Sequence, residues 1–424
     1  MTANPISWDL LPDTAAVEDG SLTIGGCDVI DLAERFGTPV FIYDEEHLRS
    51  RCREAVSAFG DGVAYASKAF LCKAMAKVAH EEGMYIDVAT GGEMHVALAA
   101  GVPGDRLVFH GNNKSAAELE MAIANDVSRI VVDSFDEMDR IETIVESSGT
   151  APKVLLRINP GIDAHTHEYL RTGIPDSKFG FPLTDAIATR AIERAKKSLA
   201  MEFIGVHMHI GSQVFDVDSF AKAVGAIAPF VNESGAEEFS VGGGLGVPYV
   251  EGESADTIGS WADTILSASR ASGITARIVA EPGRSVSAMA AVTAYTVGTI
   301  KDVPGVRTYL SVDGGISENP RPVLYGSGYE AMLPRSPLAE RPFTTRIVGK
   351  HCESGDIVVR EADLPSDTMV GDILVTPVTG AYGHSMASNY NKVGRPPVVF
   401  VNDGEARLVV ERESYEDILL KDLG

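Results

Sequence analysis

Short apolar runs alternate with amphipathic helical patterns along the chain from residue 63 to about residue 285. A short apolar run bounded by turn residues is typical of a strand, whereas apolar residues at positions i, i+3, i+4 and i+7 are typical of a helix. The runs predict strands at Val63–Lys68, Tyr85–Thr90, Leu107–Gly111, Arg129–Asp133, Lys153–Asn159, Phe203–Gly211, Glu238–Gly244 and Arg277–Gly283. Eight such strand-and-helix units over about 220 residues fit a (β/α)8 barrel in number and length. A doubly wound sheet is the alternative, although it usually has fewer strands.

Three of the predicted helices begin with a capping-box pattern, in which Ser or Thr is followed three residues later by Glu. The pairs are Thr90 with Glu93, Ser115 with Glu118, and Ser134 with Glu137. Each pair lies at or just after the end of a predicted strand, where a βα loop belongs. The helix after the first strand is expected to end at Gly83, because glycine readily adopts the left-handed conformation that closes many helices.

The pattern changes after about residue 285, where strand-like runs follow one another with Gly, Pro and Asp turns and little helix between them. These predicted strands are Val292–Ile300, Arg307–Asp313, Thr345–Gly349, Asp356–Arg360, Ile373–Pro377, Pro397–Val401 and Ala406–Glu411. The first 44 residues also lack the βα pattern and contain one short strand, Val40–Tyr43. We therefore expect an α/β protein with two domains. A (β/α)8 barrel of the TIM type would occupy residues 45–285, and an all-β domain of the Greek-key or β-barrel type would occupy residues 1–44 plus 286–424.

The composition restricts the classes of function. The 424 residues are 45% hydrophobic and 23% charged, which is ordinary for a globular protein. The net charge of −24 argues against a nucleic-acid or anionic-membrane partner, because both need a basic surface. The four cysteines show no C-x-x-C spacing, so neither a zinc site nor a disulfide framework is indicated. The N-terminus lacks a signal-peptide pattern and no run is as long as a membrane span, so we expect a cytoplasmic protein.

Chemically versatile residues gather at the C-terminal ends of the predicted barrel strands, where α/β barrels carry their active sites. They are Lys68, Asp87, His110, Arg157, Asn159, His207, His209, the glycine run at 242–244, and Glu281. A lysine with a depressed pKa at such a position can form a Schiff base with a carbonyl group. Taken alone, Lys68 is more simply explained as a surface residue, so its neighbours decide the interpretation.

A lysine, a glycine run and a glutamate at one end of a barrel indicate the cofactor pyridoxal 5'-phosphate (PLP). PLP requires a Schiff-base lysine, a phosphate cradle and a partner for its pyridine nitrogen. Backbone N–H groups of Gly242–Gly246 would close on the phosphate. Glu281 opposite the ring nitrogen would keep that nitrogen protonated and make the ring a strong electron sink. Arg284 is either a surface salt-bridge residue or, at a barrel mouth, a ligand of phosphate or of a substrate carboxylate.

Two other interpretations of these residues stay open. His207 and His209 share a face of one strand and could form a metal pair, with His110 as a further ligand. The lysine and the glycine run would then have no role, and one of the two histidines could instead be a hydrogen-bonded core residue. A dinucleotide-binding fingerprint is not indicated, because Val247 occupies the last glycine position of G-x-G-x-x-G.

The motifs occur in an order that resembles a known family. They are YASKA (65–69), HGNNKS (110–115), HIGSQ (209–213), GGGLG (242–246), EPGR (281–284), NPRPVLYG (319–326), CESGD (352–356) and GAYG (380–383). From about residue 30 to about residue 412, the chain resembles the PLP-dependent decarboxylases built on an alanine-racemase-type barrel, and most closely the diaminopimelate decarboxylases. Phe70 replaces the commoner Asn directly after the first motif. The strand-six segment that runs into the third motif reads Val-His-Met-His. Neither departure removes a functional residue.

The resemblance implies a role for each matching residue. The implied cofactor-binding residues are Lys68, His209, Ser212, Gly243, Gly244, Glu281, Gly283, Arg284 and Tyr382. The implied substrate-binding residues are Arg284, Arg321, Tyr325, Glu353 and Tyr382. The expected catalytic residues are Lys68, Glu281 and Cys352. No metal is expected. We interpret His207 as a structural residue. In a homodimer with shared active sites, Cys352 and Glu353 would reach the partner's cofactor, Cys352 to handle the proton that replaces carbon dioxide and Glu353 to pair with the distal ammonium group of the substrate.

The implied reaction is the decarboxylation of meso-2,6-diaminopimelate to L-lysine, the last step of lysine biosynthesis. The alternative is a decarboxylase of ornithine, arginine or another basic amino acid, but Arg321 with Tyr325 favours a substrate with a distal carboxylate. An amino-acid racemase on the same barrel would pair the pyridine nitrogen with an arginine, so Glu281 argues against it. A PLP carrier protein would resemble the barrel alone and leave the second domain without a role.

Overall fold

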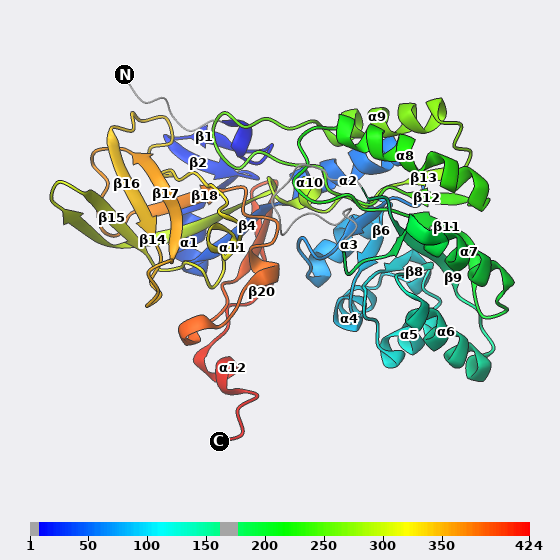
Figure 1. Cartoon of the computed structure of the whole chain (residues 1–424). Coiled ribbons are helices and arrows are strands. Elements are labelled where there is room, and N and C mark those ends of the chain that lie inside the picture. The colour runs from blue at the N-terminus through cyan, green and yellow to red at the C-terminus, as the bar shows by residue number, and fades with distance from the viewer. Residues whose placement is uncertain (1–7, 162–176) are drawn as a thin grey trace. The chain divides into compact units, whose positions relative to one another are not determined.

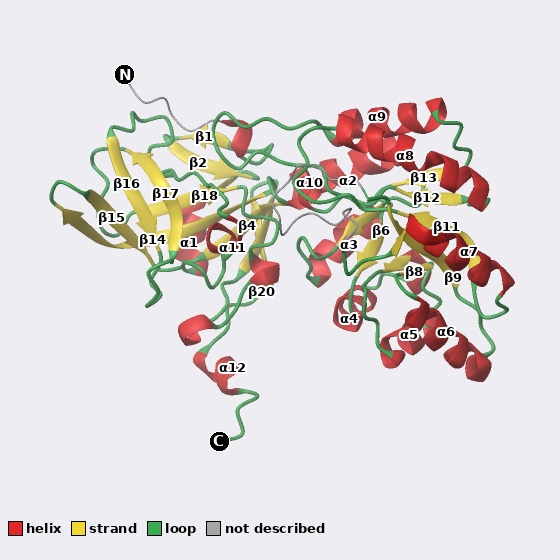
Figure 2. Cartoon of the chain, in the orientation of Figure 1, coloured by secondary structure: helices red, strands yellow, loops and turns green. Residues whose placement is uncertain are grey.

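The computed structural model describes residues 8–161 and 177–424, and the chain forms two compact units. The barrel unit comprises Arg51–Val247 and Ala255–Ser285, and the β unit comprises Met1–Ser50, Pro248–Ser254 and Val286–Gly424. Figure 1 labels their elements along the chain, and Figure 2 marks helices and strands. The domain boundaries expected from the sequence stay a prediction, because compactness alone does not define a folding unit.

The barrel unit contains the eight expected strands. They are β5 (Ala64–Ala66), β6 (Tyr85–Val88), β7 (Leu107–Phe109), β8 (Arg129–Val132), β9 (Lys153–Asn159), β11 (Glu202–His207), β12 (Glu238–Ser240) and β13 (Arg277–Val279), with the two-residue β10 (Phe181–Pro182) added beside β9. All of them pair in parallel, in the order β13-β12-β11-β9-β8-β7-β6-β5. The two ends of this sheet meet, because Ala64 N donates to Ala280 O at 3.0 Å and Ala66 N donates to Pro282 O at 3.1 Å. The prediction of a (β/α)8 barrel is confirmed.

Helices follow the strands and lie around the outside of the barrel (Figure 2). They are α3 (Lys73–Glu81), α4 (Gly91–Ala99), α5 (Ala116–Ala124), α6 (Phe135–Ser148), α7 (Ile187–Lys197), α8 (Asp218–Ser234), α9 (Ile258–Ala271) and the short α10 (Arg284–Ser287), while α2 (Glu45–Phe59) begins in the β unit and ends in the barrel unit. Because helices cover the sheet, the strands are buried on both faces, as their apolar runs indicated.

Some helix ends differ in detail from the sequence prediction. Helix α3 ends as expected: Glu82 is its C-cap, and Gly83 follows with a φ of +92° and donates to His80 O at 3.0 Å. Only α5 has the complete capping box, between Ser115 and Glu118. At α4 and α6 the Thr90 and Ser134 hydroxyls accept the expected N–H, but the glutamates bond one residue further back. Glu93 accepts from Ala89 N at 2.6 Å, and Glu137 accepts from Asp133 N at 2.9 Å.

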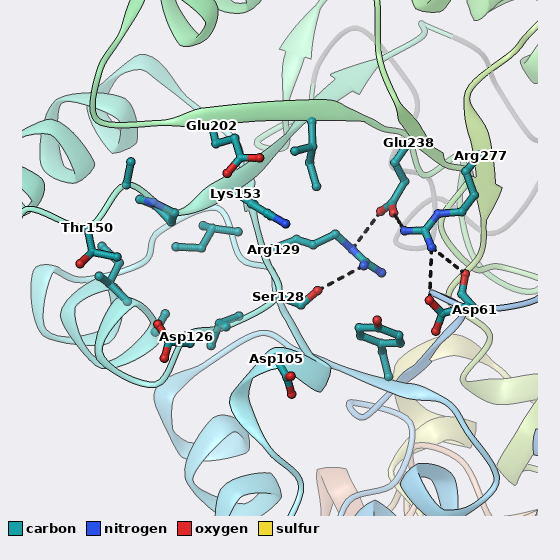
Figure 3. A pocket seen from close by; sticks show the side chains of 18 residues that line it. Asp61, Asp105, Asp126, Ser128, Arg129, Thr150, Lys153, Glu202, Glu238 and Arg277 are labelled. Carbon is teal, nitrogen blue, oxygen red and sulfur yellow. Dashed lines mark hydrogen bonds and ion pairs between the residues drawn. The ribbon is translucent and has the colours of Figure 1, made fainter.

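The N-terminal ends of the barrel strands carry a network of ion pairs beside a cavity of about 420 Å³ (Figure 3). Glu238 at the start of β12 bonds both Arg129, at 2.9 Å, and Arg277, and Arg277 also reaches Asp61 at 3.5 Å. Arg129 in addition donates to Gly62 O at 2.8 Å. The network joins the starts of β8, β12 and β13 to the turn before β5, so it ties the strands where the barrel closes. In α/β barrels this end serves stability and the opposite end serves chemistry.

The β unit is built on a mixed sheet of strands in the order β17-β16-β15-β14-β4-β19-β20, with β18 paired to β14. The strands are β4 (Val40–Asp44), β14 (Ala291–Val303), β15 (Arg307–Val312), β16 (Phe343–Val348), β17 (Ile357–Leu364), β18 (Ile373–Pro377), β19 (Val398–Asn402) and β20 (Glu405–Val410). A separate sheet contains β1 (Ala16–Glu18), β2 (Ser21–Ile24) and β3 (Cys27–Asp28). All strands predicted for this part of the chain are therefore present.

The β unit is not purely β, which corrects one detail of the prediction. It contains α1 (Val29–Phe36), α11 (Arg321–Tyr325) and α12 (Tyr415–Leu419). Helix α1 is capped by the Asp28 carboxylate, and its Val29, Leu32 and Ala33 join the buried core with Val40 and Ile42 of β4. Across residues 8–161 and 177–424, no helix combines the length and apolar character needed to cross a membrane.

Candidate active site

The functional residues of the barrel unit lie at the C-terminal ends of its strands. Lys68 is in the turn after β5, Asp87 is in β6, His110 directly follows β7, His207 ends β11, Ser240 ends β12 and Glu281 follows β13. Parallel strands bring these ends to one side of a barrel, which explains how residues more than two hundred positions apart in the chain become neighbours.

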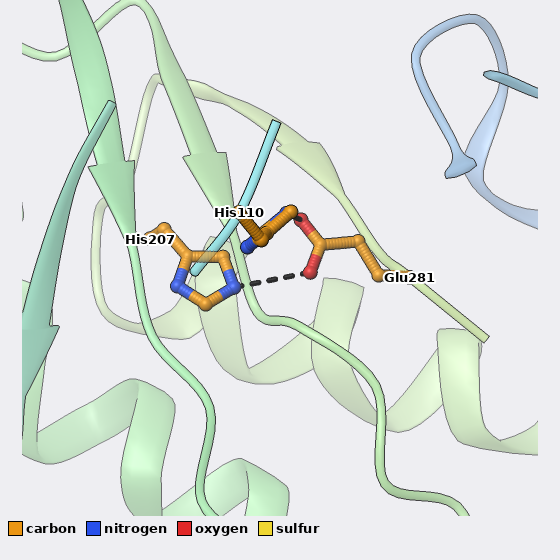
Figure 4. A group of neighbouring side chains, drawn as sticks. All are labelled: His110, His207 and Glu281. Atoms are coloured by element: carbon orange, nitrogen blue, oxygen red, sulfur yellow. Dashed lines mark hydrogen bonds and ion pairs between the residues drawn. The ribbon is translucent and has the colours of Figure 1, made fainter. Parts of the chain in front are cut away.

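Glu281 is the most strongly held of these residues (Figure 4). Its Oε2 lies 3.0 Å from His207 Nε2, and its Oε1 accepts from Ser240 Oγ at 2.8 Å and lies 3.3 Å from His110 Nε2. Burial would raise the pKa of this carboxyl group, but His110 and His207 outweigh burial and hold the pKa well below its usual range. Glu281 is therefore an ionised carboxylate in a buried setting.

The two histidines beside Glu281, His110 and His207, differ in how their surroundings shift their pKa values. Burial lowers the pKa of His207 to about 4, so His207 is neutral near pH 7. Burial also acts to lower the pKa of His110, but Asp87 and Glu281 outweigh it and raise that pKa. The pKa values of the two histidines beside Glu281 therefore move in opposite directions, and His207 contributes a hydrogen bond to the carboxylate. Asp87 lies 3.7 Å from His110, and burial raises the Asp87 pKa to about 6.

Two lysines lie near this end of the barrel, and only one is available for chemistry. Lys114 is buried, and its ammonium group donates to Gly111 O at 2.7 Å, to Val131 O at 2.6 Å and to Glu137 at 2.7 Å, which uses all three of its protons. Lys68 is exposed and makes no hydrogen bond or ion pair with any residue that the structure describes. It is close enough to Asp87 to lower the pKa of that carboxyl group.

The glycine run packs directly against neighbouring backbone, which leaves no room for a side chain at Gly243 or Gly244. A Cβ at Gly243 would meet Glu281 O at 2.3 Å, and a Cβ at Gly244, where φ is +122°, would meet Gly211 O at 2.3 Å. Next to this run, Arg284 at the start of α10 donates to Ser212 Oγ at 2.9 Å. Bare backbone with an arginine and a serine beside it is suited to holding a phosphate.

A second group of candidate residues belongs to the β unit and surrounds Arg321. Arg321 is buried, and its guanidinium lies 4.8 Å from the ring centre of Tyr249, 5.5 Å from that of Tyr325 and 6.0 Å from that of Tyr382. It also donates to Tyr329 Oη at 3.0 Å. The sequence interpretation included Tyr325 and Tyr382 but missed Tyr249 and Tyr329. A signal was available, since both are tyrosines beside glycine- and proline-containing turns, but nothing in the sequence linked them to Arg321.

The Cys352–Asp356 loop of the β unit has three exposed residues, Cys352, Glu353 and Ser354. The buried Asp356 carboxylate holds this loop, because it accepts from Ile316 N at 2.8 Å, from His351 N at 2.8 Å and pairs with His351 Nδ1 at 2.9 Å. Cys352 and Glu353 are therefore displayed to solvent on a fixed backbone, as residues that meet another molecule would be.

The metal interpretation of the histidines can now be compared with the geometry. The side chains that come together are His110, His207 and Glu281, with potential ligand atoms within 4.8 Å of one another, and not the expected pair His207 and His209. A carboxylate can only accept hydrogen bonds, and Glu281 takes one from Ser240 and one from His207. We therefore interpret the cluster as an anion held by hydrogen-bond donors.

The residues of the barrel unit fit PLP. A lysine without a bonding partner among the described residues, a run of closely packed glycines with Arg284 and Ser212, and a buried ionised carboxylate match the three features that the cofactor requires.

Comparison with known proteins agrees with this fit. Residues 45–288 match the family model "Pyridoxal-dependent decarboxylase, pyridoxal binding domain". The fold and the site thus define a PLP-dependent decarboxylase with a (β/α)8 barrel.

More specifically, the chain belongs to the diaminopimelate decarboxylase family. It is 45% identical over 422 residues to diaminopimelate decarboxylase of Bacillus subtilis and 44% identical over 428 residues to that of Mycobacterium tuberculosis, with 96% of each chain covered in both cases. Among solved structures, it is similar to diaminopimelate decarboxylase of M. jannaschii in complex with L-lysine, with a TM-score of 0.89, 33% identity and coverage of 97% and 98% of the two chains. The Helicobacter pylori enzyme with L-lysine gives a TM-score of 0.84 and 32% identity, with coverage of 93% and 98%.

The structure places the predicted site residues in two groups. Those in the barrel unit are Lys68, His209, Ser212, Gly243, Gly244, Glu281, Gly283 and Arg284, and those in the β unit are Arg321, Tyr325, Cys352, Glu353 and Tyr382. Their individual roles stay predictions. Sequence reasoning missed Ser240 altogether and treated His207 as structural, whereas both bond the Glu281 carboxylate.

Proposed function

We propose that this chain catalyses the decarboxylation of meso-2,6-diaminopimelate to L-lysine and carbon dioxide, the last step of lysine biosynthesis. The observation that carries the proposal is the ionised Glu281 carboxylate, held by His207 and Ser240 at the same barrel end as Lys68 and the glycine cradle. The 45% identity to a curated diaminopimelate decarboxylase over almost the whole chain supports the choice of substrate.

PLP, when bound, supplies an electron-withdrawing ring that accepts the electron pair left when the substrate loses its carboxyl group. Lys68 Nζ would provide the covalent attachment, and His209 would pack against the ring. The backbone N–H groups of Gly243 and Gly244, with Ser212, would bind the phosphate. Glu281 would hold a proton on the ring nitrogen, which its remaining acceptor capacity allows, since a carboxylate offers about four lone-pair positions.

The proposed substrate-binding residues recognise the unreacting end of diaminopimelate. Arg284, Arg321, Tyr325 and Tyr382 bind the carboxylate at the unreacting end, and the tyrosines around Arg321 support a fixed orientation of its guanidinium. In a cytoplasmic homodimer, Glu353 of each chain pairs with the distal ammonium group at the other chain's site, and Cys352 Sγ delivers the proton that replaces carbon dioxide. The exposure of Cys352 and Glu353 supports this shared arrangement.

Substrate choice is the direct test of the proposed function. The PLP-loaded protein is expected to release carbon dioxide from meso-diaminopimelate and to form lysine in equal amount. Carbon dioxide release and lysine formation are measured with diaminopimelate, lysine, ornithine and arginine at the same concentration. Faster turnover of ornithine, arginine or lysine would identify the alternative class of basic amino-acid decarboxylase.

The Arg321→Ala variant is expected to lose diaminopimelate turnover, chiefly through a higher KM, because a charge-assisted hydrogen bond and the orientation it gives both disappear. The matched control is Arg346→Ala, since Arg346 lies on β16 and, among the described residues, bonds only the Arg360 carbonyl. Steady-state rates with PLP in excess distinguish the two. An Arg321 variant with the kinetics of the control would remove Arg321 from substrate binding.

The Glu281→Gln variant is expected to bind PLP and yet turn over on the order of a hundredfold more slowly. The neutral amide no longer holds a proton on the ring nitrogen. Because His207 and Ser240 bond different oxygens of Glu281, the NH2 group of Gln would face the donor of one of these two residues. Turnover is measured at saturating substrate, with cofactor content checked by absorbance. Unchanged turnover in the PLP-bound variant would show that an ionised group at this position is not needed.

A further inference from the structure

His207 makes one hydrogen bond through its ring, and that bond goes to Glu281. Its Nε2 lies 3.0 Å from Glu281 Oε2, whereas its Nδ1 is buried and has no hydrogen-bond partner among the described residues. The side chain is only about 2% exposed, so bulk solvent does not reach the ring. A protonated imidazole carries a proton on each nitrogen and would need an acceptor at both. His207 has an acceptor at Nε2 alone among the described residues, so its surroundings do not suit the charged form.

The chemistry of the two nitrogens fixes the form of the ring. Glu281 is ionised and can only accept, so the proton of the bond sits on His207 Nε2. A second proton on Nδ1 would bury a charged N–H group without a partner, which is costly. His207 is therefore neutral with its proton on Nε2, in agreement with the lowering of its pKa by burial.

Both carboxylate oxygens of Glu281 accept a hydrogen bond from a neutral donor, Oε1 from Ser240 and Oε2 from His207. Ser240 Oγ donates to Oε1 at 2.8 Å and also accepts from Gly242 N at 3.2 Å, so this hydroxyl links the carboxylate to the glycine run. With one donor on each oxygen, the carboxylate cannot rotate without breaking a bond. A neutral donor also leaves the negative charge of Glu281 in place, whereas a protonated His207 would compete with a protonated ring nitrogen for it.

We propose that His207 is a positioning residue that fixes the Glu281 carboxylate, through a neutral Nε2–H donor, in the orientation that faces the pyridine nitrogen of PLP. The proposal rests on the proposed contact between Glu281 and that nitrogen. The proposed role belongs to His207 and not to His110. His110 Nε2 lies 3.3 Å from Glu281 Oε1 and 3.7 Å from Asp87 Oδ1.

The test compares His207→Gln with His207→Met. Both side chains are flexible and similar in length, but only Gln carries an N–H at the place of Nε2. His95→Met is the matched control, because His95 is exposed on α4. Cofactor-free protein is titrated with PLP and with the carbocyclic analogue that has C–H in place of the ring nitrogen. The measured quantity is the ratio of the two dissociation constants, which isolates the ring nitrogen from the phosphate and lysine contacts.

Wild-type protein and His95→Met are expected to prefer PLP over the analogue by the same factor. His207→Met should reduce that preference about tenfold, the usual scale for one hydrogen bond to a charged group, and His207→Gln should restore most of it. The kcat of His207→Met should fall in parallel while the KM for diaminopimelate stays unchanged.

The other outcomes contradict the proposal in distinguishable ways. Equal loss of affinity for both compounds, or loss of all binding in both variants, would make His207 a packing residue. An unchanged preference in His207→Met would show that Glu281 needs no such support. Wild-type protein without any preference would remove the Glu281 contact itself, and with it both the assigned role of Glu281 and the role of His207.

Discussion

Replacing Lys68 with alanine is expected to lower the rate of carbon dioxide release by at least about a thousandfold, the scale seen when a covalent catalytic residue is removed. Lys68 lies in the turn after β5, is exposed, and makes no ion pair with the described part of the chain, so its amine is free to be the attachment point. Its removal leaves the phosphate cradle and Glu281 intact. The variant should therefore still bind PLP, but without the covalent link and without turnover.

The control for this variant is Lys73→Ala, because Lys73 is an exposed lysine at the start of α3, five positions further along the chain. It should retain the wild-type rate. Rates are measured as carbon dioxide released from diaminopimelate, with folding compared by circular dichroism. A Lys68 variant as active as the Lys73 variant would assign the covalent role to another residue.

Mixing two inactive variants, Lys68→Ala and Cys352→Ala, is expected to restore activity. Cys352 is exposed on a loop that the buried Asp356 holds, as a residue that acts in another subunit would be. A dimer with two-fold symmetry has two equivalent sites, each with Lys68 from one chain and Cys352 from the other. In the mixed dimer, one site carries both lesions and the other carries neither. Random exchange of subunits should therefore return about a quarter of the wild-type rate, since half of the dimers are mixed and each has one intact site.

The controls are the two variants alone, taken through the same exchange of subunits. Native mass spectrometry shows whether mixed dimers have formed. If mixed dimers are present and the rate stays at the level of the separate variants, Lys68 and Cys352 act within one chain.

The barrel could be predicted because its strands are recognisable in the amino-acid sequence. Each is a short apolar run, since helices cover the sheet and both strand faces are buried. The chemistry could be placed because parallel strands all point the same way, so a residue at the end of one run, such as Lys68 or Glu281, must lie near the ends of the others.

The sequence could not reveal which of these residues touch. His207 and Ser240 meet Glu281 because β11, β12 and β13 pair in a register where Gly205 faces Glu238 and Glu238 faces Arg277. Register depends on packing of the whole barrel, and no local pattern records it. The same holds for the tyrosines around Arg321, which come from segments near residues 249, 325 and 382. Helix α1 was missed for a simpler reason, since eight residues give few turns of helical periodicity.

The claim that PLP is attached to Lys68 at the C-terminal end of the barrel is tested most directly by reduction with borohydride. The purified, PLP-loaded protein is treated with borohydride, digested, and its peptides are analysed by mass spectrometry. The reduced phosphopyridoxyl group is predicted on Lys68 alone, and not on Lys114, whose three protons are all bonded to Gly111, Val131 and Glu137. The group on Lys114 or on any other lysine, or no trapped group in a protein that releases carbon dioxide, would contradict this assignment.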